Sequence, residues 1–224
     1  MRRRLLYILI LLLAAAPGLR AQWAVNTAVR RYVQEDLRKG GTLPFYDIGS
    51  YVQYVPGTVH LGLGLAGVPA SHALLDRSIE SAIAHLFCFS AGHALKYALH
   101  VKRPDSDATN SCPSGHASVA FTGAELLRMD YGWGWGAGGY TLGVFVCADR
   151  IYGDRHWLTD VIAGAGLGIL SAHVGGWLLE PVKRLFGIPE LDWDGFGTGK
   201  VRVAATPAVD PVSGSSCISL ALQF

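Results

Sequence analysis

The chain has 224 residues, of which 50% are hydrophobic and 16% are charged, and its formal net charge is +2. This length supports one domain with a sizeable core rather than two domains. A nearly balanced charge lacks the basic field of nucleic-acid-binding proteins, so we expect no nucleic-acid partner.

The N-terminal segment predicts export. Three arginines at positions 2–4 precede an apolar run over residues 5–16, and a small residue, Ala21, closes the segment. This order is typical of a secretory signal peptide over residues 1–21. The run is short for a membrane span of ~20 residues, and an uncleaved anchor helix is the alternative. Both interpretations place the residues that directly follow this segment, from Trp23 on, outside the cytoplasm.

Residues 22–54 predict an amphipathic helix followed by a loop. Apolar side chains recur at helical spacing over residues 24–40, and charged residues occupy the other faces. Gly40 and Gly41 end this helix, and the loop after them carries Asp47.

Five apolar runs of helical character follow within residues 55–190. They cover residues 55–73, 78–101, 115–130, 134–149 and 157–180. The sequence therefore predicts an all-α fold, a bundle of about five to six helices. In the last run small residues recur every four positions, at Gly164, Gly168, Ala172 and Gly176, which predicts close approach to a neighbouring helix.

The runs 55–73, 78–101 and 157–180 are long enough to cross a membrane. A membrane-embedded bundle is the favoured interpretation, and a soluble or peripheral exported enzyme is the alternative. Residues 191–224 differ, with two strand-like segments separated by Pro and Gly. They predict a C-terminal β-hairpin, and a disordered tail is the alternative because two strands alone are marginally stable.

Basic residues at the end of the second run predict a phosphate site. Lys96 and Arg103 are seven positions apart, so they share one helical face, and Pro104 closes the helix. Arg150 adds a third cation, whose planar guanidinium suits phosphate oxygens. His93 and His100 flank Lys96; a metal pair is conceivable, but we expect them to line the cleft instead.

The start of the third run carries Ser114, Gly115 and His116. Free backbone N–H groups at a helix start favour an anion, and a glycine there lets the backbone approach it. His116 can protonate a leaving oxygen as the general acid.

His156 and Asp160 are four positions apart, as neighbours on a helix are. A carboxylate beside an imidazole fixes its tautomer and stabilises the imidazolium. The other ring nitrogen is then free to attack phosphorus, so His156 is the predicted nucleophile. Because successive helices alternate in direction, all three segments fall at the same end of the bundle.

Together these segments resemble the signature of the type 2 phosphatidic acid phosphatase and vanadium haloperoxidase superfamily, over about residues 55–180. By that resemblance the phosphate-binding residues are Lys96, Arg103, Ser114, Gly115 and Arg150. The catalytic residues are His116 as acid, His156 as nucleophile and Asp160 as its orienting partner. The resemblance also implies that the phosphatase reaction needs no metal or other cofactor.

Asp149 departs from this pattern, because the family usually has Ser before the third-segment arginine. A carboxylate at this position repels a phosphate dianion unless Arg150 or Arg155 pairs with it. The departure is compatible with an altered substrate preference, or with a site that works best when protonated.

The sequence thus predicts a metal-independent phosphatase that acts on a phosphomonoester or diphosphate through a phosphohistidine intermediate. The expected partners are the membrane and a phosphorylated lipid, of the lipid A, undecaprenyl diphosphate or phosphatidate type. The site would face the periplasm or the outside. The alternatives are a soluble exported acid phosphatase, a vanadium haloperoxidase and a phospholipid-binding module without activity.

Overall fold

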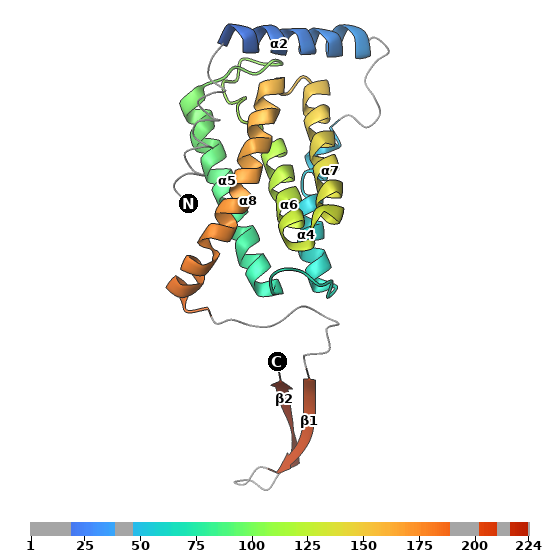
Figure 1. The fold of residues 1–224 in the computed structure, drawn as a ribbon, viewed down its shortest axis with the longest axis vertical. Coiled ribbons are helices and arrows are strands. Elements are labelled where there is room, and N and C mark those ends of the chain that lie inside the picture. The colour runs from blue at the N-terminus through green and yellow to red at the C-terminus, as the bar shows by residue number, and fades with distance from the viewer. Residues whose placement is uncertain (1–18, 39–46, 189–201, 210–215, 224) are drawn as a thin grey trace.

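The computed structural model describes residues 19–38, 47–188, 202–209 and 216–223 (Figure 1). Within them the helices are α2 (Leu19–Arg31), the π-helix η1 (Tyr32–Leu37), α3 (Gly49–Val52), α4 (Val55–Leu65), α5 (Leu74–Leu99), α6 (Gly115–Tyr131), α7 (Trp133–Tyr152) and α8 (Leu158–Phe186). Strands β1 (Arg202–Val209) and β2 (Ser216–Gln223) pair antiparallel. They lie in residues 191–224, the segment for which a β-hairpin is predicted.

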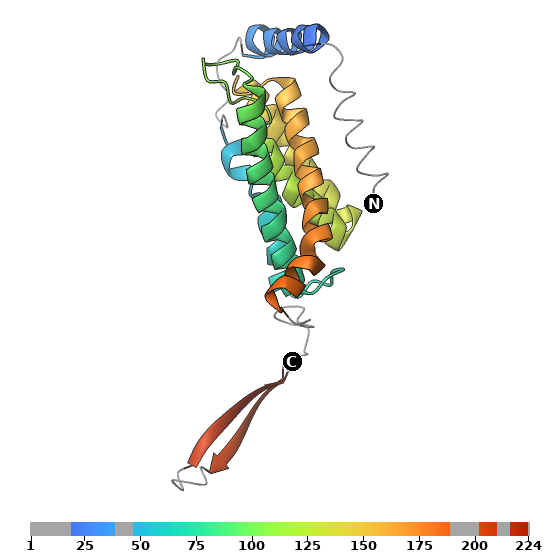
Figure 2. The same cartoon turned by 90° about the vertical axis from the view of Figure 1, so that its left-hand side faces the viewer.

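Helix α6 is the centre of a helical bundle. It contacts α4, α5, α7 and α8, and most of its side chains are buried. Figures 1 and 2 show α5 to α8 running along one another, with α2 lying across one end of the bundle. The predicted all-α bundle is confirmed for the helical part of the described chain.

Glycines bring α8 unusually close to α6. A Cβ atom added to Gly164 would lie 2.5 Å from the Ser114 carbonyl oxygen, and one added to Gly168 would lie 2.4 Å from the Ser118 carbonyl oxygen. Such distances are shorter than van der Waals contact, so these positions exclude any side chain. The predicted close approach along the small-residue repeat is confirmed at both glycines.

Several predicted helix boundaries are wrong, including the end of α4 and the start of α2. Helix α4 ends at Leu65 and not at residue 73, because Gly67 takes a positive φ of 75° and a proline follows at position 69. Helix α2 begins at Leu19 and not at residue 24, because residues 19–23 contain no proline or glycine that would break the helix. Of the segment 1–21, residues 1–18 lie outside the described part of the chain.

The shorter α4 also changes the expected membrane spans. Its 11 residues reach about 16 Å, about half the thickness of a bilayer core. Among the described residues, one helix is long and apolar enough to cross a membrane, namely α8.

Candidate active site

The predicted nucleophile sits in a buried cluster with its partner. The His156 Nδ1 atom lies 3.6 Å from Asp160 Oδ2, and both side chains are at most 3% exposed. Ser111 also belongs to this cluster: its hydroxyl donates to Asp160 Oδ2 at 2.5 Å and lies 3.4 Å from His156 Nδ1. Because Nδ1 faces the carboxylate, the Nε2 atom is the one left for a substrate.

The expectation that His156 and Asp160 share a helix needs a correction. Helix α8 begins at Leu158, so His156 precedes it, and Asp160 lies in its first turn. The Asp160 carboxylate instead accepts a hydrogen bond from the backbone N–H of Trp157 at 2.9 Å. This helix-capping contact keeps the carboxylate beside the imidazole.

Burial sets the charge of the two histidines in the site. Burial lowers the pKa of His156, and the neighbouring Asp160 carboxylate only partly opposes this, while Arg103 and Lys96 repel the cation. Burial and the neighbouring Arg150 lower the pKa of His116 to about 4; this side chain lies in the first turn of α6, at the site end. These surroundings therefore favour the neutral form of both rings in the absence of substrate.

The prediction that Lys96 and Arg103 share one helical face is wrong, because α5 ends at Leu99 and Arg103 follows it. Both cations nevertheless converge on one loop residue. Lys96, in the last turn of α5, donates from Nζ to the backbone oxygen of Asn110 at 2.7 Å. Arg103 donates from Nε to the Asn110 side-chain oxygen at 2.8 Å. Asn110 thus holds both cations on the side of the bundle where His156 lies.

The N-terminus of α6 carries the residues predicted to bind an anion. Ser114 precedes the helix, is fully buried, and has no hydrogen-bond partner for its hydroxyl among the described residues. Gly115 is exposed, and a Cβ atom there would meet nothing within 4 Å. The first-turn His116 Nε2 lies 3.5 Å from the Ser50 hydroxyl.

Two carboxylates hold the third predicted cation, Arg150. Its Nε donates to Asp149 Oδ2 at 2.9 Å, and its Nη2 contacts the same oxygen and also lies 2.6 Å from Asp47 Oδ1. This ion pair lowers the pKa of Asp47. The side chains of Arg150 and Asp149 are 4% and 6% exposed. The pairing expected to offset the Asp149 charge is therefore present, with Asp47 as an additional partner.

Helix α2 is tied across the same end of the bundle (Figure 1). Asn26 exchanges two hydrogen bonds with Thr159, one to its hydroxyl at 2.9 Å and one from its backbone N–H at 3.2 Å. Arg30 pairs with Asp154 at 2.7 Å, on the connection between α7 and α8. The amphipathic helix therefore covers the catalytic end through polar contacts.

The structure gathers the predicted site residues at one end of the bundle. It does not gather the two histidines that flank Lys96: His93 bonds to the carbonyl of Phe89 on its own helix at 3.0 Å, and His100 is exposed at the end of α5. Sequence reasoning missed the loop residues that hold the site together. These are Asp47, Ser50, Asn110 and Ser111.

Known proteins share both the motifs and the fold. Residues 93–180, which carry all three predicted segments, match the family model described as the PAP2 superfamily. A lipid A 1-phosphatase of Porphyromonas gingivalis is 41% identical over 96 residues, which cover 41% of this chain and 21% of that protein. The chain therefore spans about a fifth of the length of this relative.

Two crystal structures show the same fold. LpxE of Aquifex aeolicus has a TM-score of 0.52 and 21% identity, covering 68% of this chain and 95% of its own. The first transmembrane PAP2 type phosphatidylglycerolphosphate phosphatase of Bacillus subtilis has a TM-score of 0.51 and 21% identity, covering 80% of this chain and 96% of its own.

Proposed function

We propose that this chain, whose residues 93–180 form a PAP2 superfamily domain, is a phosphatase that passes a phosphoryl group to His156 and then to water. The observation that carries this proposal is the buried His156–Asp160–Ser111 cluster beside the basic residues of the three segments. A neutral imidazole with one nitrogen oriented by a carboxylate is the form that can attack phosphorus.

In the first step, the His156 Nε2 atom forms a bond to phosphorus as the bond from phosphorus to the leaving oxygen breaks. The proton on Nδ1 stays with the imidazole, and the Asp160 carboxylate stabilises the cation. Lys96, Arg103 and Arg150 bind the phosphoryl oxygens, and His116 gives the leaving oxygen its proton.

In the second step, water attacks phosphorus and the bond to His156 breaks. His116, neutral after the first step, takes the proton of the water, and inorganic phosphate leaves. His116 must therefore be protonated when the substrate binds, although burial and Arg150 lower its pKa to about 4. A bound phosphate dianion favours the imidazolium, so substrate binding itself supplies the condition for acid catalysis.

We propose a phosphorylated lipid as the substrate. The matched relative from Porphyromonas gingivalis is a lipid A 1-phosphatase, and the similar structure from Bacillus subtilis is a phosphatidylglycerolphosphate phosphatase. A lipid places its phosphate at a membrane surface, which is where the amphipathic α2 and the end of a membrane helix would lie.

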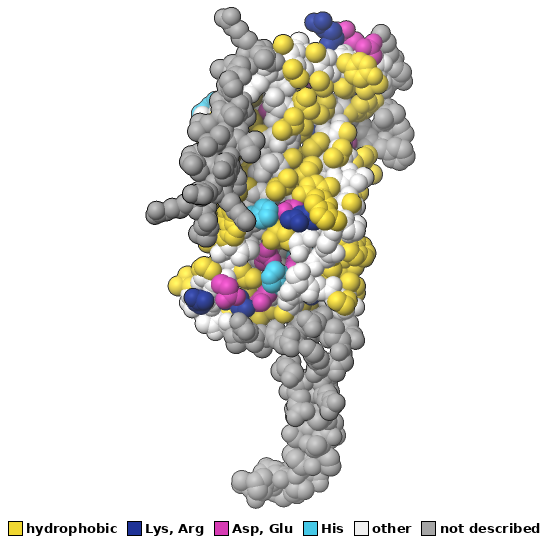
Figure 3. All heavy atoms as spheres, in the orientation of Figure 1, with side chains coloured by type: hydrophobic (Ala, Val, Ile, Leu, Met, Phe, Trp, Pro, Cys, Tyr) yellow, Lys and Arg dark blue, Asp and Glu magenta, His cyan; other side chains and the backbone are white. Residues whose placement is uncertain are grey.

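The surface of the bundle supports membrane insertion. Helix α8 is long and apolar enough to span a bilayer. On the outer helices, large apolar side chains are exposed, including Leu86, Phe89, Val144 and Ile162, each at least 60% exposed. Figure 3 shows hydrophobic side chains spread over the described part of this surface. We propose that these faces contact lipid and that the catalytic end faces the periplasm or the outside.

Phosphate release from a substrate panel tests this function. The full chain, purified in detergent and treated with EDTA, would be given lipid A, phosphatidate, undecaprenyl diphosphate and p-nitrophenyl phosphate. We expect release from at least one lipid to exceed release from p-nitrophenyl phosphate, and vanadate to inhibit it. Equal turnover of the soluble ester, with release of the enzyme from membranes by salt alone, would favour the soluble acid phosphatase.

The nucleophile is tested by trapping the intermediate. An acid-labile, alkali-stable phosphoenzyme should form on mixing with labelled substrate and quenching in alkali. His156→Ala should abolish both this species and phosphate release. His93→Ala, which changes an exposed histidine of α5, is the matched control and should retain both. Full activity in His156→Ala would contradict the proposed mechanism.

A further inference from the structure

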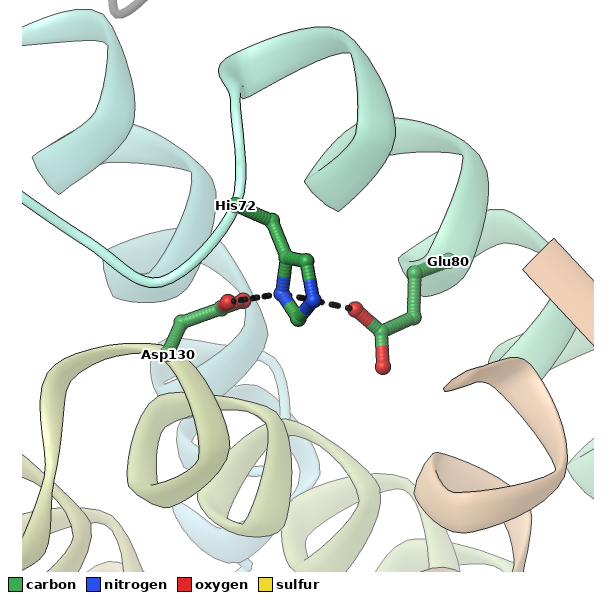
Figure 4. A group of neighbouring side chains, drawn as sticks. All are labelled: His72, Glu80 and Asp130. Atoms are coloured by element: carbon green, nitrogen blue, oxygen red, sulfur yellow. Dashed lines mark hydrogen bonds and ion pairs between the residues drawn. The ribbon is translucent and has the colours of Figure 1, made fainter. Parts of the chain in front are cut away.

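A second cluster of titratable side chains lies at the opposite end of the bundle from His156. His72 stands on the connection before α5, Glu80 in the second turn of α5, and Asp130 in the last turn of α6 (Figure 4). Each offers one ligand atom, and the three atoms lie within 4.8 Å of one another. The phosphatase mechanism uses none of these groups.

The buried carboxylate of Glu80, unpartnered in the described part of the chain, indicates that a ligand binds in this cluster. Its side chain is 1% exposed, and neither carboxylate oxygen has a hydrogen-bond partner among the described residues. The nearest basic atom recorded is His72 Nδ1, 4.0 Å from Glu80 Oε2. A buried carboxylate with both oxygens unsatisfied is strongly unfavourable unless a proton or a cation neutralises it. Figure 4 shows this carboxylate pointing toward the imidazole.

The distances between the three groups fit a shared metal ion. His72 Nδ1 lies 2.8 Å from Asp130 Oδ1 and 4.0 Å from Glu80 Oε2. In a tetrahedral zinc site, bonds of about 2.0–2.2 Å place neighbouring ligand atoms about 3.3–3.6 Å apart. The two observed separations fall on either side of this range, so side-chain shifts of less than about 1 Å would bring both of these pairs into it.

Neighbouring residues hold two of the proposed ligands, Asp130 and Glu80, in place. The second oxygen of Asp130 lies 2.6 Å from His60 Nε2, and both of these side chains are fully buried. A hydrogen bond of this kind orients a ligating carboxylate. On the other side, a Cβ atom at Gly176 would lie only 3.0 Å from Glu80 Oε1, so the glycine keeps space beside the carboxylate. The His72 side chain is 43% exposed and gives an ion access from solvent.

We propose that His72, Glu80 and Asp130 bind a divalent transition metal, with Zn²⁺ the ion that suits one imidazole and two carboxylates. Magnesium and calcium prefer an all-oxygen set, which the imidazole does not provide. The ion would join the connection before α5, α5 itself and the end of α6. Its role is therefore structural, and it does not depend on the proposed phosphatase activity.

The test is zinc retention by the full chain. The protein, purified in detergent and stripped with a chelator, would be given Zn²⁺, desalted and analysed for metal, and its thermal unfolding would be followed with and without Zn²⁺. We expect one Zn²⁺ per chain and a higher unfolding midpoint. Chain without retained zinc, or with an unchanged midpoint, would overturn the proposal.

Variants locate the ion. His72→Ala changes a partly exposed side chain, and Glu80→Gln removes charge at nearly constant volume. Each should lose the retained Zn²⁺ and weaken binding at least about 100-fold. His93→Ala and His156→Ala should keep it, which separates this cluster from an exposed histidine and from the catalytic end. Full retention in His72→Ala would refute the assignment even if Glu80→Gln failed to fold.

Discussion

Replacing Asp149 by Asn should improve phosphate binding, because Asp149 competes with the substrate for Arg150. The Asp149 carboxylate takes two donors of the guanidinium, and its Oδ1 also accepts the backbone N–H of Asp47 at 3.2 Å. Asparagine keeps the shape and one acceptor oxygen for that N–H. The substitution therefore removes the charge while leaving the loop anchored.

The size of the effect follows from charge and burial. A charge about 6 Å from a phosphate repels each phosphate charge by about 0.7 kcal/mol in water and about 2.8 kcal/mol at an effective dielectric of about 20. Asp149 is 6% exposed, so the true value exceeds the water limit. Even that limit gives about 1.4 kcal/mol for a dianion, which is tenfold in affinity. Asp47 is 45% exposed, and its effect is expected to be smaller, about twofold.

Steady-state phosphate release, with the substrate varied, measures this change. We expect Asp149→Asn to lower KM by about tenfold and to bind inorganic phosphate more tightly to a similar extent. Asp47→Asn should move both quantities in the same direction by less. If KM stays constant or rises in Asp149→Asn, then Asp149 serves to position Arg150 and the reasoning from charge competition is refuted.

Three further outcomes are expected. Gly168→Ala should lower the thermal unfolding midpoint by the equivalent of about 1–3 kcal/mol, because its Cβ would meet the backbone of α6, whereas Gly166→Ala on the same helix meets nothing within 4 Å and should be neutral or stabilising. Burial holds the pKa of His156 below its usual value, Asp160 partly opposes this, and the neutral ring is the active form. Asp160→Asn should therefore lower the pKa of His156 further, move the acid limb of kcat/KM to lower pH and reduce kcat by about 10³-fold. An unchanged acid limb would refute the orienting role of Asp160. Ser111→Ala should reduce kcat by about tenfold, because it removes a 2.5 Å hydrogen bond to the orienting carboxylate, and an unchanged kcat would exclude this contribution.

The sequence was sufficient to predict the helical bundle and the segments that match a known family model. Long apolar runs predict α5 to α8 to within a few residues, because Pro, Gly and polar clusters separate them. The three short segments resemble the superfamily signature, and residues 93–180, which contain them, match the PAP2 superfamily model. Alternating helix direction was also enough to place these segments at one end.

The residues that hold the site could not be predicted in the same way. Asp47 reaches Arg150 across 103 positions, and Ser111 reaches Asp160 across 49, both from loops without periodicity. The only sequence feature that points to Ser111 is its position just before the second segment. This feature is not specific, because serines are common in turns and loops. The His72, Glu80 and Asp130 cluster likewise joins positions whose spacing matches no metal motif.

Helix α6 carries the start of the catalytic segment at one end and Asp130 at the other, and protein surrounds most of its length. In a bilayer, lipid chains would therefore contact α5, α7 and α8, while α6 would remain surrounded by protein. Exchanging lipid for detergent, or one bilayer thickness for another, would then disturb the outer helices first. If the proposed membrane insertion is correct, the part of the site on α6 should therefore depend little on lipid composition.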